Sequence, residues 1–386
     1  MPAMRISKLT LNGNDQTPVA AADANYPTLQ LEKSILVSTA VRGTDNKIQL
    51  DLTDDHLVEL VFEDETTWLC TPDTLEELYP GQLAQQRGGD DAFQLPLTIS
   101  DTRSDRGLLQ QIALKVVNLF TKKAAAKGMG LLAEDLEEKQ LGKLRGLVRV
   151  TNTFDLVPFN AAEMQGPALL FIHGTNSSST GSFAELVGTD LWTYITQTYN
   201  KNNILAFQHE TMTKSPLQNA VELISQLPAD IELHLITHSR GGLVGEILAR
   251  CSDANQSDIG FSEKEVEYLT KEGRDADVKY IRQLQEVYRM KRHRTGRFIR
   301  VACPSGGTTI LSKRLDHFFN ISLNLIGATT GLAVNPIYVA TKNLLSAIID
   351  QKNDPNVLPG LEAMKPDSPF IVVLNNQDTI DRKSVV

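Results

Sequence analysis

Short apolar runs alternate with amphipathic segments through the second half of the chain. Each run is bounded by polar or turn-forming residues, which predicts a buried strand. The predicted strands cover residues 147–154, 167–173, 203–207, 231–236 and 298–303. Helices are predicted between them, over residues 183–199, 217–227 and 240–250. This alternation predicts an α/β fold in which a mostly parallel sheet is covered by helices on both faces.

The first hundred residues follow a different pattern. Residues 49–52 and 57–62 alternate apolar and polar side chains in part, and a tight turn at residues 63–65 leads into a further strand over 66–70. Strands that follow one another this closely are typical of hairpins. We therefore predict a small β-rich domain over residues 1–100, ahead of the α/β region.

A helical connector is predicted over residues 101–145. Its apolar side chains fall on one helical face behind a cap at residues 104–105; they are Leu109, Ile112, Val116 and Leu119. The main domain follows over residues 146–386. It contains a helical insert at residues 261–292, which begins at a capping box formed by Ser262 and Glu265.

Composition and charge narrow the function classes. The chain has 386 residues, 41% of them hydrophobic and 22% charged, and a net charge of −9. That charge argues against a nucleic-acid partner, because phosphate binding needs clustered cations. The three cysteines lack metal-ligand or disulfide spacing, and no cofactor motif is present. No signal-peptide core and no apolar run of about 18 residues is found, so we expect a cytoplasmic protein without a membrane span.

The segment at residues 233–244 (LHLITHSRGGLV) carries the candidate chemistry. An apolar run ends in Thr237-His-Ser-Arg-Gly241, and a helix-forming segment follows at once. This layout favours Ser239 on a sharp strand-to-helix turn, with its hydroxyl exposed as a nucleophile. The main-chain N–H groups of Arg240 and Thr175 are the expected donors to an oxyanion, because both follow predicted strands at the same edge.

These residues resemble motifs of the α/β-hydrolase superfamily, in particular its lipase-like members. The oxyanion-loop motif is matched by residues 171–175 (FIHGT), the nucleophile elbow by 237–244 (THSRGGLV), and a later loop by 302–308 (ACPSGGT). The resemblance covers roughly residues 145–376. The first hundred residues are similar to an N-terminal region of bacterial hydrolase-like proteins, some of which carry further C-terminal domains.

The resemblance also implies an acid and then a histidine after the nucleophile, in that chain order. Residues 366–375 (PDSPFIVVLN) are open to two interpretations. They begin a helix, in which case acid and base both lie beyond the given sequence, or they form a strand that leads to Asp378 as the acid. The last histidine, His317, is followed by predicted helix, and His209 is the best local candidate for a histidine that lines the site.

The expected function is therefore a serine hydrolase that cleaves an ester or related acyl bond through an acyl-enzyme on Ser239. Apolar residues between 311 and 349 favour a small-molecule or lipid-like ester. The alternative is a non-catalytic recognition or regulatory module of a larger protein. Two features motivate it: the missing late histidine, and Thr237 at a position where the elbow pattern prefers glycine. Peptidase and thioesterase activities use the same residues and stay open.

Overall fold

The computed structural model describes most of the chain. The described residues are 8–16, 29–37, 47–63, 66–72, 75, 83–84, 92–96, 98–101, 110–122, 129–252, 259–308, 336–350 and 358–375. Close contacts divide the chain into two compact units. Unit 1 comprises residues 1–132 with 315–354, and unit 2 comprises residues 133–314 with 355–386. Each unit is described by itself.

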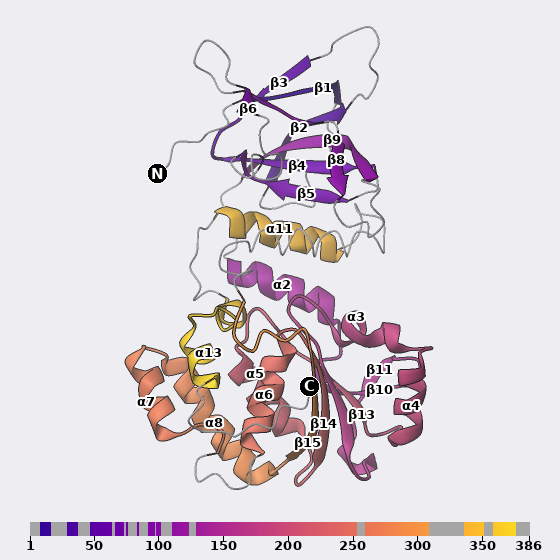
Figure 1. Cartoon of the computed structure of the whole chain (residues 1–386), viewed down its shortest axis with the longest axis vertical. Coiled ribbons are helices and arrows are strands. Elements are labelled where there is room, and N and C mark those ends of the chain that lie inside the picture. Colours follow the sequence, from indigo (N-terminus) through magenta and orange to yellow (C-terminus); the bar gives the residue numbers. More distant parts are fainter. Residues whose placement is uncertain are drawn as a thin grey trace. The chain divides into compact units, whose positions relative to one another are not determined.

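Unit 1 is built on a nine-stranded sheet (Figure 1). The strand order is β5-β4-β9-β2-β1-β7-β6, with β3 paired to β1 and β8 paired to β9. All of its pairings are antiparallel except β1 with β7. The strands are β1 (Lys8–Gln16), β2 (Leu29–Val37), β3 (Lys47–Asp51), β4 (His56–Phe62), β5 (Thr67–Cys70), β6 (Leu83–Ala84), β7 (Ala92–Gln94), β8 (Thr98–Asp101) and β9 (Gln110–Lys122).

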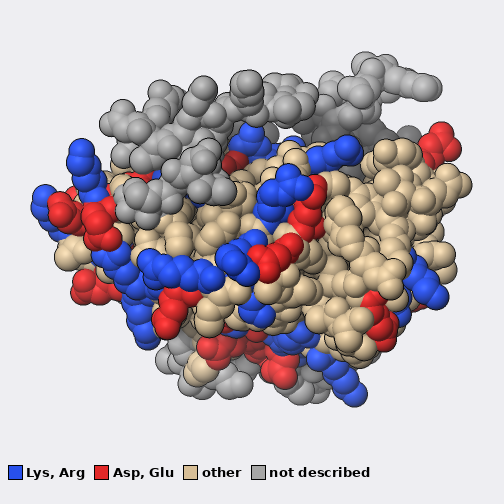
Figure 2. Space-filling view, turned by 90° about the horizontal axis from the view of Figure 1, so that it is seen from below, with Lys and Arg blue, Asp and Glu red and all other residues tan. Residues whose placement is uncertain are grey.

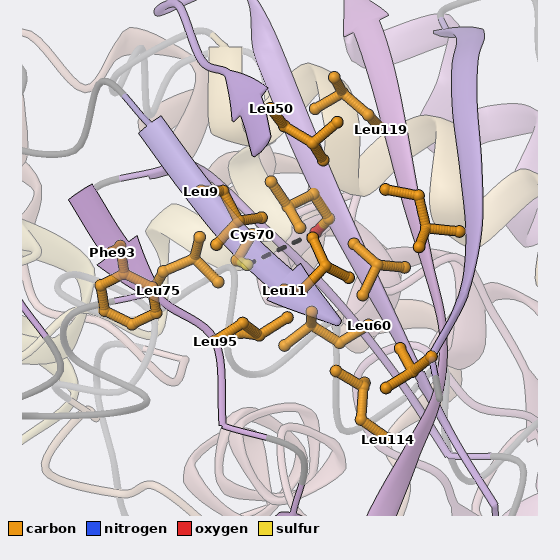
Figure 3. Close-up of a cluster of buried hydrophobic side chains, with 14 of the residues drawn as sticks. Leu9, Leu11, Leu50, Leu60, Cys70, Leu75, Phe93, Leu95, Leu114 and Leu119 are labelled. Atoms are coloured by element: carbon orange, nitrogen blue, oxygen red, sulfur yellow. Dashed lines mark hydrogen bonds between the residues drawn. The ribbon is translucent and has the colours of Figure 1, made fainter. Parts of the chain in front are cut away.

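The core of unit 1 lies on one side of these strands, where leucine side chains from several of them converge (Figure 3). Leu9, Leu60 and Phe93 are fully buried there, and the Cys70 thiol donates a hydrogen bond of 3.4 Å to the carbonyl of Val58. A weak donor that finds a main-chain acceptor can be buried at little cost. The predicted strands at residues 49–52, 57–62 and 66–70 overlap β3, β4 and β5.

The helix predicted behind residues 104–105 is wrong, because residues 110–122 form the long strand β9. Leu114, Val117 and Leu119 of this strand are buried in the core. Apolar residues in this segment satisfy a helical spacing and a strand spacing equally, and the pairing of β9 with β2 and β4 decides for the strand. Only α2 (Met129–Leu141) is helical within the predicted connector, as far as its residues are described.

A buried ion pair joins distant parts of unit 1. The Lys342 ammonium, on α11 (Pro336–Asp350), lies 2.6 Å from the Glu59 carboxylate on β4, and these side chains are only 2% and 6% exposed. Asn118 donates a further hydrogen bond of 2.7 Å to Glu59, and the Lys342 ammonium lies 4.2 Å from the ring centre of Phe120. Burial of such a pair costs desolvation free energy. Removal of one partner costs more, because it leaves a buried charge without compensation.

Unit 2 is built on a six-stranded mixed sheet of order β11-β10-β13-β12-β14-β15. Strands β13, β12, β14 and β15 are parallel, whereas β10 is antiparallel to both of its neighbours. The strands are β10 (Gly146–Val150), β11 (Leu156–Pro158), β12 (Ala168–Ile172), β13 (Ile204–Gln208), β14 (Glu232–His238) and β15 (Arg294–Val301). Each of the five strands predicted after residue 146 overlaps one of these.

Helices lie on both sides of this sheet. In Figure 1 the strands separate α5, α6 and α8 from α3 and α4. The helices of unit 2 with the bounds given by the structure are α3 (Ser179–Phe183), α4 (Asp190–Thr198), α5 (Pro216–Gln226), α6 (Gly241–Cys251), α7 (Glu263–Lys271), α8 (Asp275–Lys291), α12 (Pro359–Glu362) and α13 (Pro369–Leu374), with short 3₁₀ turns at residues 161–163 and 184–186. The predicted insert at residues 261–292 contains α7 and α8, and its capping box of Ser262 and Glu265 is confirmed.

The predicted fold class, a mostly parallel α/β-hydrolase-like sheet, is wrong for this chain. Antiparallel pairings outnumber parallel ones, since unit 1 is almost wholly antiparallel and unit 2 is mixed. The physical reason is connection length. The short turn between β10 and β11 can join only antiparallel neighbours, whereas a parallel pair needs a crossover.

Among the described residues, no helix combines the length and the apolar character that a membrane span requires.

Removal of the cation of the buried ion pair is expected to destabilise unit 1. Lys342→Met leaves the Glu59 carboxylate buried without its counter-charge, so unfolding should become easier by about 3–5 kcal/mol. Urea unfolding measured by Trp68 fluorescence, in a Trp192→Phe background, reports on this unit. Lys115→Met, at an exposed position of β9, is the control and should change stability by less than about 0.5 kcal/mol. Equal effects of the two substitutions would contradict the expectation.

Candidate functional site

Ser239 occupies a left-handed turn between β14 and α6. Its φ is +51°, a region that non-glycine residues rarely adopt. The turn is held by main-chain hydrogen bonds: the Ser239 N–H donates to Val301 at 2.8 Å, and the Ser239 carbonyl accepts from Gly242 at 2.9 Å. The serine side chain is half-exposed and makes no hydrogen bond among the described residues. The sequence therefore predicted the local strand–turn–helix geometry of this serine correctly.

Close backbone packing beneath the turn requires glycine. A Cβ at Gly241 would lie 2.3 Å from the carbonyl oxygen of Ile172, on β12. A Cβ at Gly242 would lie 2.1 Å from the Cys303 sulfur, and one at Gly245 would lie 2.6 Å from the Phe298 ring. Side chains on this face of α6 would push the helix away from β12 and β15, which support the turn on either side.

The loop after β12 lies against the serine. A Cβ at Gly174 would lie 2.7 Å from the Ser239 Cβ and 3.0 Å from the His238 carbonyl oxygen. The next residue, Thr175, donates its hydroxyl to the Met364 sulfur at 3.5 Å. The Thr308 N–H, from the third sequence motif, donates to the Met364 carbonyl at 2.8 Å. The structure thus brings the three sequence motifs together around the turn.

This loop is anchored from α2 by a buried carboxylate. Glu137 is 2% exposed and accepts main-chain hydrogen bonds from Thr211, from Met212 at 2.7 Å and from Thr213 at 3.3 Å. The Thr211 hydroxyl then accepts from the Asn176 N–H at 3.1 Å. A carboxylate that satisfies several N–H groups at once holds them in one arrangement. Glu137 therefore fixes the loop that borders Ser239, through residues 211–213.

The side chain of Arg240 is a second anchor. It is fully buried, and its guanidinium donates to the carbonyls of Gly360 at 3.1 Å and Lys214 at 2.5 Å, and to the Asn219 side-chain oxygen at 3.0 Å. Burial lowers the pKa of Arg240 to about 9, while the charge of Glu137 acts in the opposite direction. Three acceptors from three separate segments hold the residue that directly follows Ser239 in the chain.

The sequence motifs indicate a role only for the main-chain N–H of Arg240, and neither side-chain anchor was predicted. No pattern in the sequence marks Glu137, since it lies on an ordinary amphipathic helix and its partners are more than seventy residues away. The predicted oxyanion donors, the N–H groups of Arg240 and Thr175, lie on the two backbone segments that meet at Ser239. Their role as donors stays a prediction.

Two histidines near the site, His173 and His209, are buried, and burial favours their neutral form. His173 donates from Nδ1 to the Gly174 carbonyl at 3.0 Å, and its Nε2 accepts from the His209 N–H at 3.3 Å. His209 stacks on Phe207, with ring centres 4.7 Å apart, and its Nδ1 bonds to the Phe207 carbonyl at 3.0 Å. Burial lowers the pKa of His173 to about 4 and that of His209 well below its usual value.

His209 is close to the loop that borders the serine, yet it makes no hydrogen bond to Ser239. Its Nε2 is buried without a partner among the described residues. Its role in catalysis stays a prediction.

Two other candidates, Asp378 and His317, lie outside the described residues. Residues 369–374 form α13, so the helix predicted at this tail is confirmed and the strand is wrong, while the position of the acid and the base stays a prediction. Among the described residues, no group of three or more His, Cys, Asp or Glu side chains could hold a metal ion.

The chain matches one known protein family. A family model described as "Domain of unknown function (DUF7379)" matches residues 147–268 and 279–385. The chain belongs to this family. No curated protein and no solved structure matches it. The expected membership of the lipase-like α/β-hydrolases is therefore wrong, since the matching family is a different one and the two sheets are antiparallel and mixed.

A methyl group at Gly241 should disrupt the turn. Gly241→Ala places a Cβ against the Ile172 and His173 carbonyls, so unit 2 should lose about 1–3 kcal/mol of stability. Urea unfolding followed by Trp192 fluorescence, in a Trp68→Phe background, measures the loss. Gly306→Ala is the matched control, because a Cβ there meets nothing within 4 Å. If both substitutions have the same effect, close packing at Gly241 is not what holds the turn.

Protonation of His173 should destabilise the site in acid. Burial lowers its folded pKa from 6.5 to about 4, so the unfolded chain binds more protons between these values. The contribution of His173 is thus complete above pH 6.5 and is lost as the pH falls towards 4, by about 3 kcal/mol. An NMR titration of its ring protons, assigned with His173→Gln, should give a midpoint near 4. A midpoint near the ordinary value of histidine would rule out the buried neutral state.

Proposed function

We propose that unit 2 is a serine hydrolase that cleaves an ester or related acyl bond. The observation that carries the proposal is the left-handed, half-exposed Ser239 between a parallel strand and a helix N-terminus, with the Gly174 main chain against it. Backbone strain of this kind costs about 1–3 kcal/mol and is found most often at functional sites. The buried anchors of Arg240 and Glu137 and the close packing at Gly174 and Gly241 maintain it here.

The reaction would proceed in two steps. The Ser239 oxygen attacks the acyl carbon and gives up its proton to a base, and the tetrahedral intermediate expels an alcohol that takes up a proton. Water then attacks the acyl-serine, which releases the acid and restores the hydroxyl. The N–H groups of Arg240 and Thr175 would stabilise the negative charge on the carbonyl oxygen in both steps. The positive end of the α6 dipole favours the same charge.

Charge distribution supports a small or lipid-like ester over a nucleic acid. Figure 2 shows a face on which basic and acidic side chains are mixed. Two of the exposed cations are paired with carboxylates, Arg282 with Glu263 at 2.6 Å and Arg292 with Asp230 at 2.9 Å. The apolar residues between 311 and 349 do not add to this support, because α11 belongs to unit 1 and residues 311–335 lie outside the described residues. Cys70, Cys251 and Cys303 form no disulfide bond, which is compatible with the proposed cytoplasmic location.

One observation favours the second candidate function, a non-catalytic recognition module. Among the described residues, no histidine or carboxylate donates to or accepts from the Ser239 hydroxyl. An inactive relative would keep the turn for stability and use the surface around it for binding. The two candidates differ in one measurable property, the reactivity of the serine oxygen.

Reactivity of Ser239 tests the proposed function directly. A fluorophosphonate probe should label the chain at Ser239, and Ser239→Ala should reduce labelling and ester hydrolysis at least a hundredfold. Ser177→Ala, on the neighbouring loop, is the control and should leave both within about twofold. Mass spectrometry of the labelled peptide identifies the residue. A folded chain that is not labelled, although thermal unfolding shows a native transition, would favour the recognition module.

A further inference from the structure

A cavity of about 310 Å³ lies beside α8 in unit 2. Its wall comes from the first turn of α5, the first turns of α8 and the short helix α12. The polar lining residues include Ser215, Gln218, Arg274, Asp277, Tyr280 and Glu362. A volume of this size is at the small end of the range for ligand pockets. The cavity is separate from the Ser239 turn in its lining residues.

The charges in the wall are unbalanced. The Arg274 guanidinium pairs with Asp277 at 2.8 Å and with Glu362 at 2.7 Å, so one cation serves two carboxylates. The two acidic side chains are only 5% and 10% exposed. Arg274 bonds to one oxygen of each carboxylate, Asp277 Oδ2 and Glu362 Oε2. The second oxygens, Asp277 Oδ1 and Glu362 Oε1, have no partner among the described residues. These oxygens belong to buried side chains that line an open cavity.

The electrostatics indicate which ligand would suit this wall. Burial raises the pKa of Asp277 despite the opposing effect of Arg274, and the charge of Glu362 raises it further. A second cation would neutralise the excess negative charge and donate hydrogen bonds to the two second oxygens. Ala276, Tyr280 and Pro359 contribute apolar surface to the same wall, which suits a short alkyl chain attached to the cation.

We propose that this cavity binds a small organic cation, an alkylammonium whose N–H groups donate to the free oxygens of Asp277 and Glu362. The carboxylates accept the charged head, and the alkyl stem lies against the apolar part of the wall. This site goes beyond the proposed hydrolase function and does not depend on it.

The cavity shares its wall with the anchor of the Ser239 turn. The guanidinium of Arg240 bonds to Lys214, Asn219 and Gly360, and the residues next to them in the chain line the cavity. Those neighbours are Ser215, Gln218 and Pro359. An occupant would therefore stabilise the three segments that hold Arg240. Its binding can be located by slower hydrogen exchange in these segments.

Calorimetric titration of the full chain with 1,5-diaminopentane tests the proposal. The matched uncharged probe is 1,5-pentanediol, at equal ionic strength. We expect the diamine to bind with a Kd on the order of 0.1–1 mM and the diol to bind at least tenfold more weakly. Hydrogen exchange with the diamine present should slow in residues 213–219 and 358–362. Equal binding of the two probes, or protection elsewhere only, would overturn the proposal.

Two variants and a control complete the experiment. Asp277→Asn should weaken diamine binding at least tenfold, and Glu263→Gln, an exposed carboxylate on α7, should leave it unchanged. Because Asp277→Asn also alters an ion pair, Ala276→Phe provides an independent test. This position is exposed and lines the cavity, so the ring fills the space without removing a charge. Undiminished diamine binding by folded Ala276→Phe would also overturn the proposal.

Discussion

The guanidinium of Arg240 is a charge in the interior of unit 2, and the arrangement around Ser239 depends on how that charge is satisfied. A buried cation that lacks acceptors costs several kcal/mol, so the chain must supply them. It does so from three segments that are far apart in sequence, at Lys214, Asn219 and Gly360. Because Arg240 follows Ser239 directly, the same hydrogen bonds that stabilise the buried charge also prevent the turn from relaxing.

The glycines and the Glu137 carboxylate complete this constraint from the other side. Gly174 and Gly241 allow main chain to approach main chain at distances that a side chain would forbid. Glu137 orders residues 211–213, which in turn hold Asn176 and the loop beside the serine. Two charged groups, one acidic and one basic, thus organise the loops at one edge of the sheet. Neither of them needs to touch a substrate.

Local sequence signals predicted the parts of the site that are set by neighbouring residues. The turn at Ser239 follows from an apolar run that meets glycines and a helix-forming segment, and the capping box at Ser262 is likewise local. Long-range pairing was not predictable in this way. The segment 110–122 has apolar residues at both helical and strand spacing, and only its partners β2 and β4 decide the outcome. The Arg240 and Glu137 anchors involve partners at least twenty residues away, which no motif encodes.

The Lys342–Glu59 pair has a consequence for biosynthesis. The two residues are 283 positions apart, and all of unit 2 up to residue 314 is synthesised between them. At the usual elongation rates of about 5–20 residues per second, the lysine emerges on the order of 15–60 s after the glutamate. During that interval the acidic position on β4 lacks its cation, although the nine strands of unit 1, all within residues 8–122, have already been synthesised. The strands of unit 1 therefore have time to pair before its buried carboxylate gains a cation, and the amino-terminal third reaches its final form only when the ribosome has delivered a helix encoded near the other end of the message.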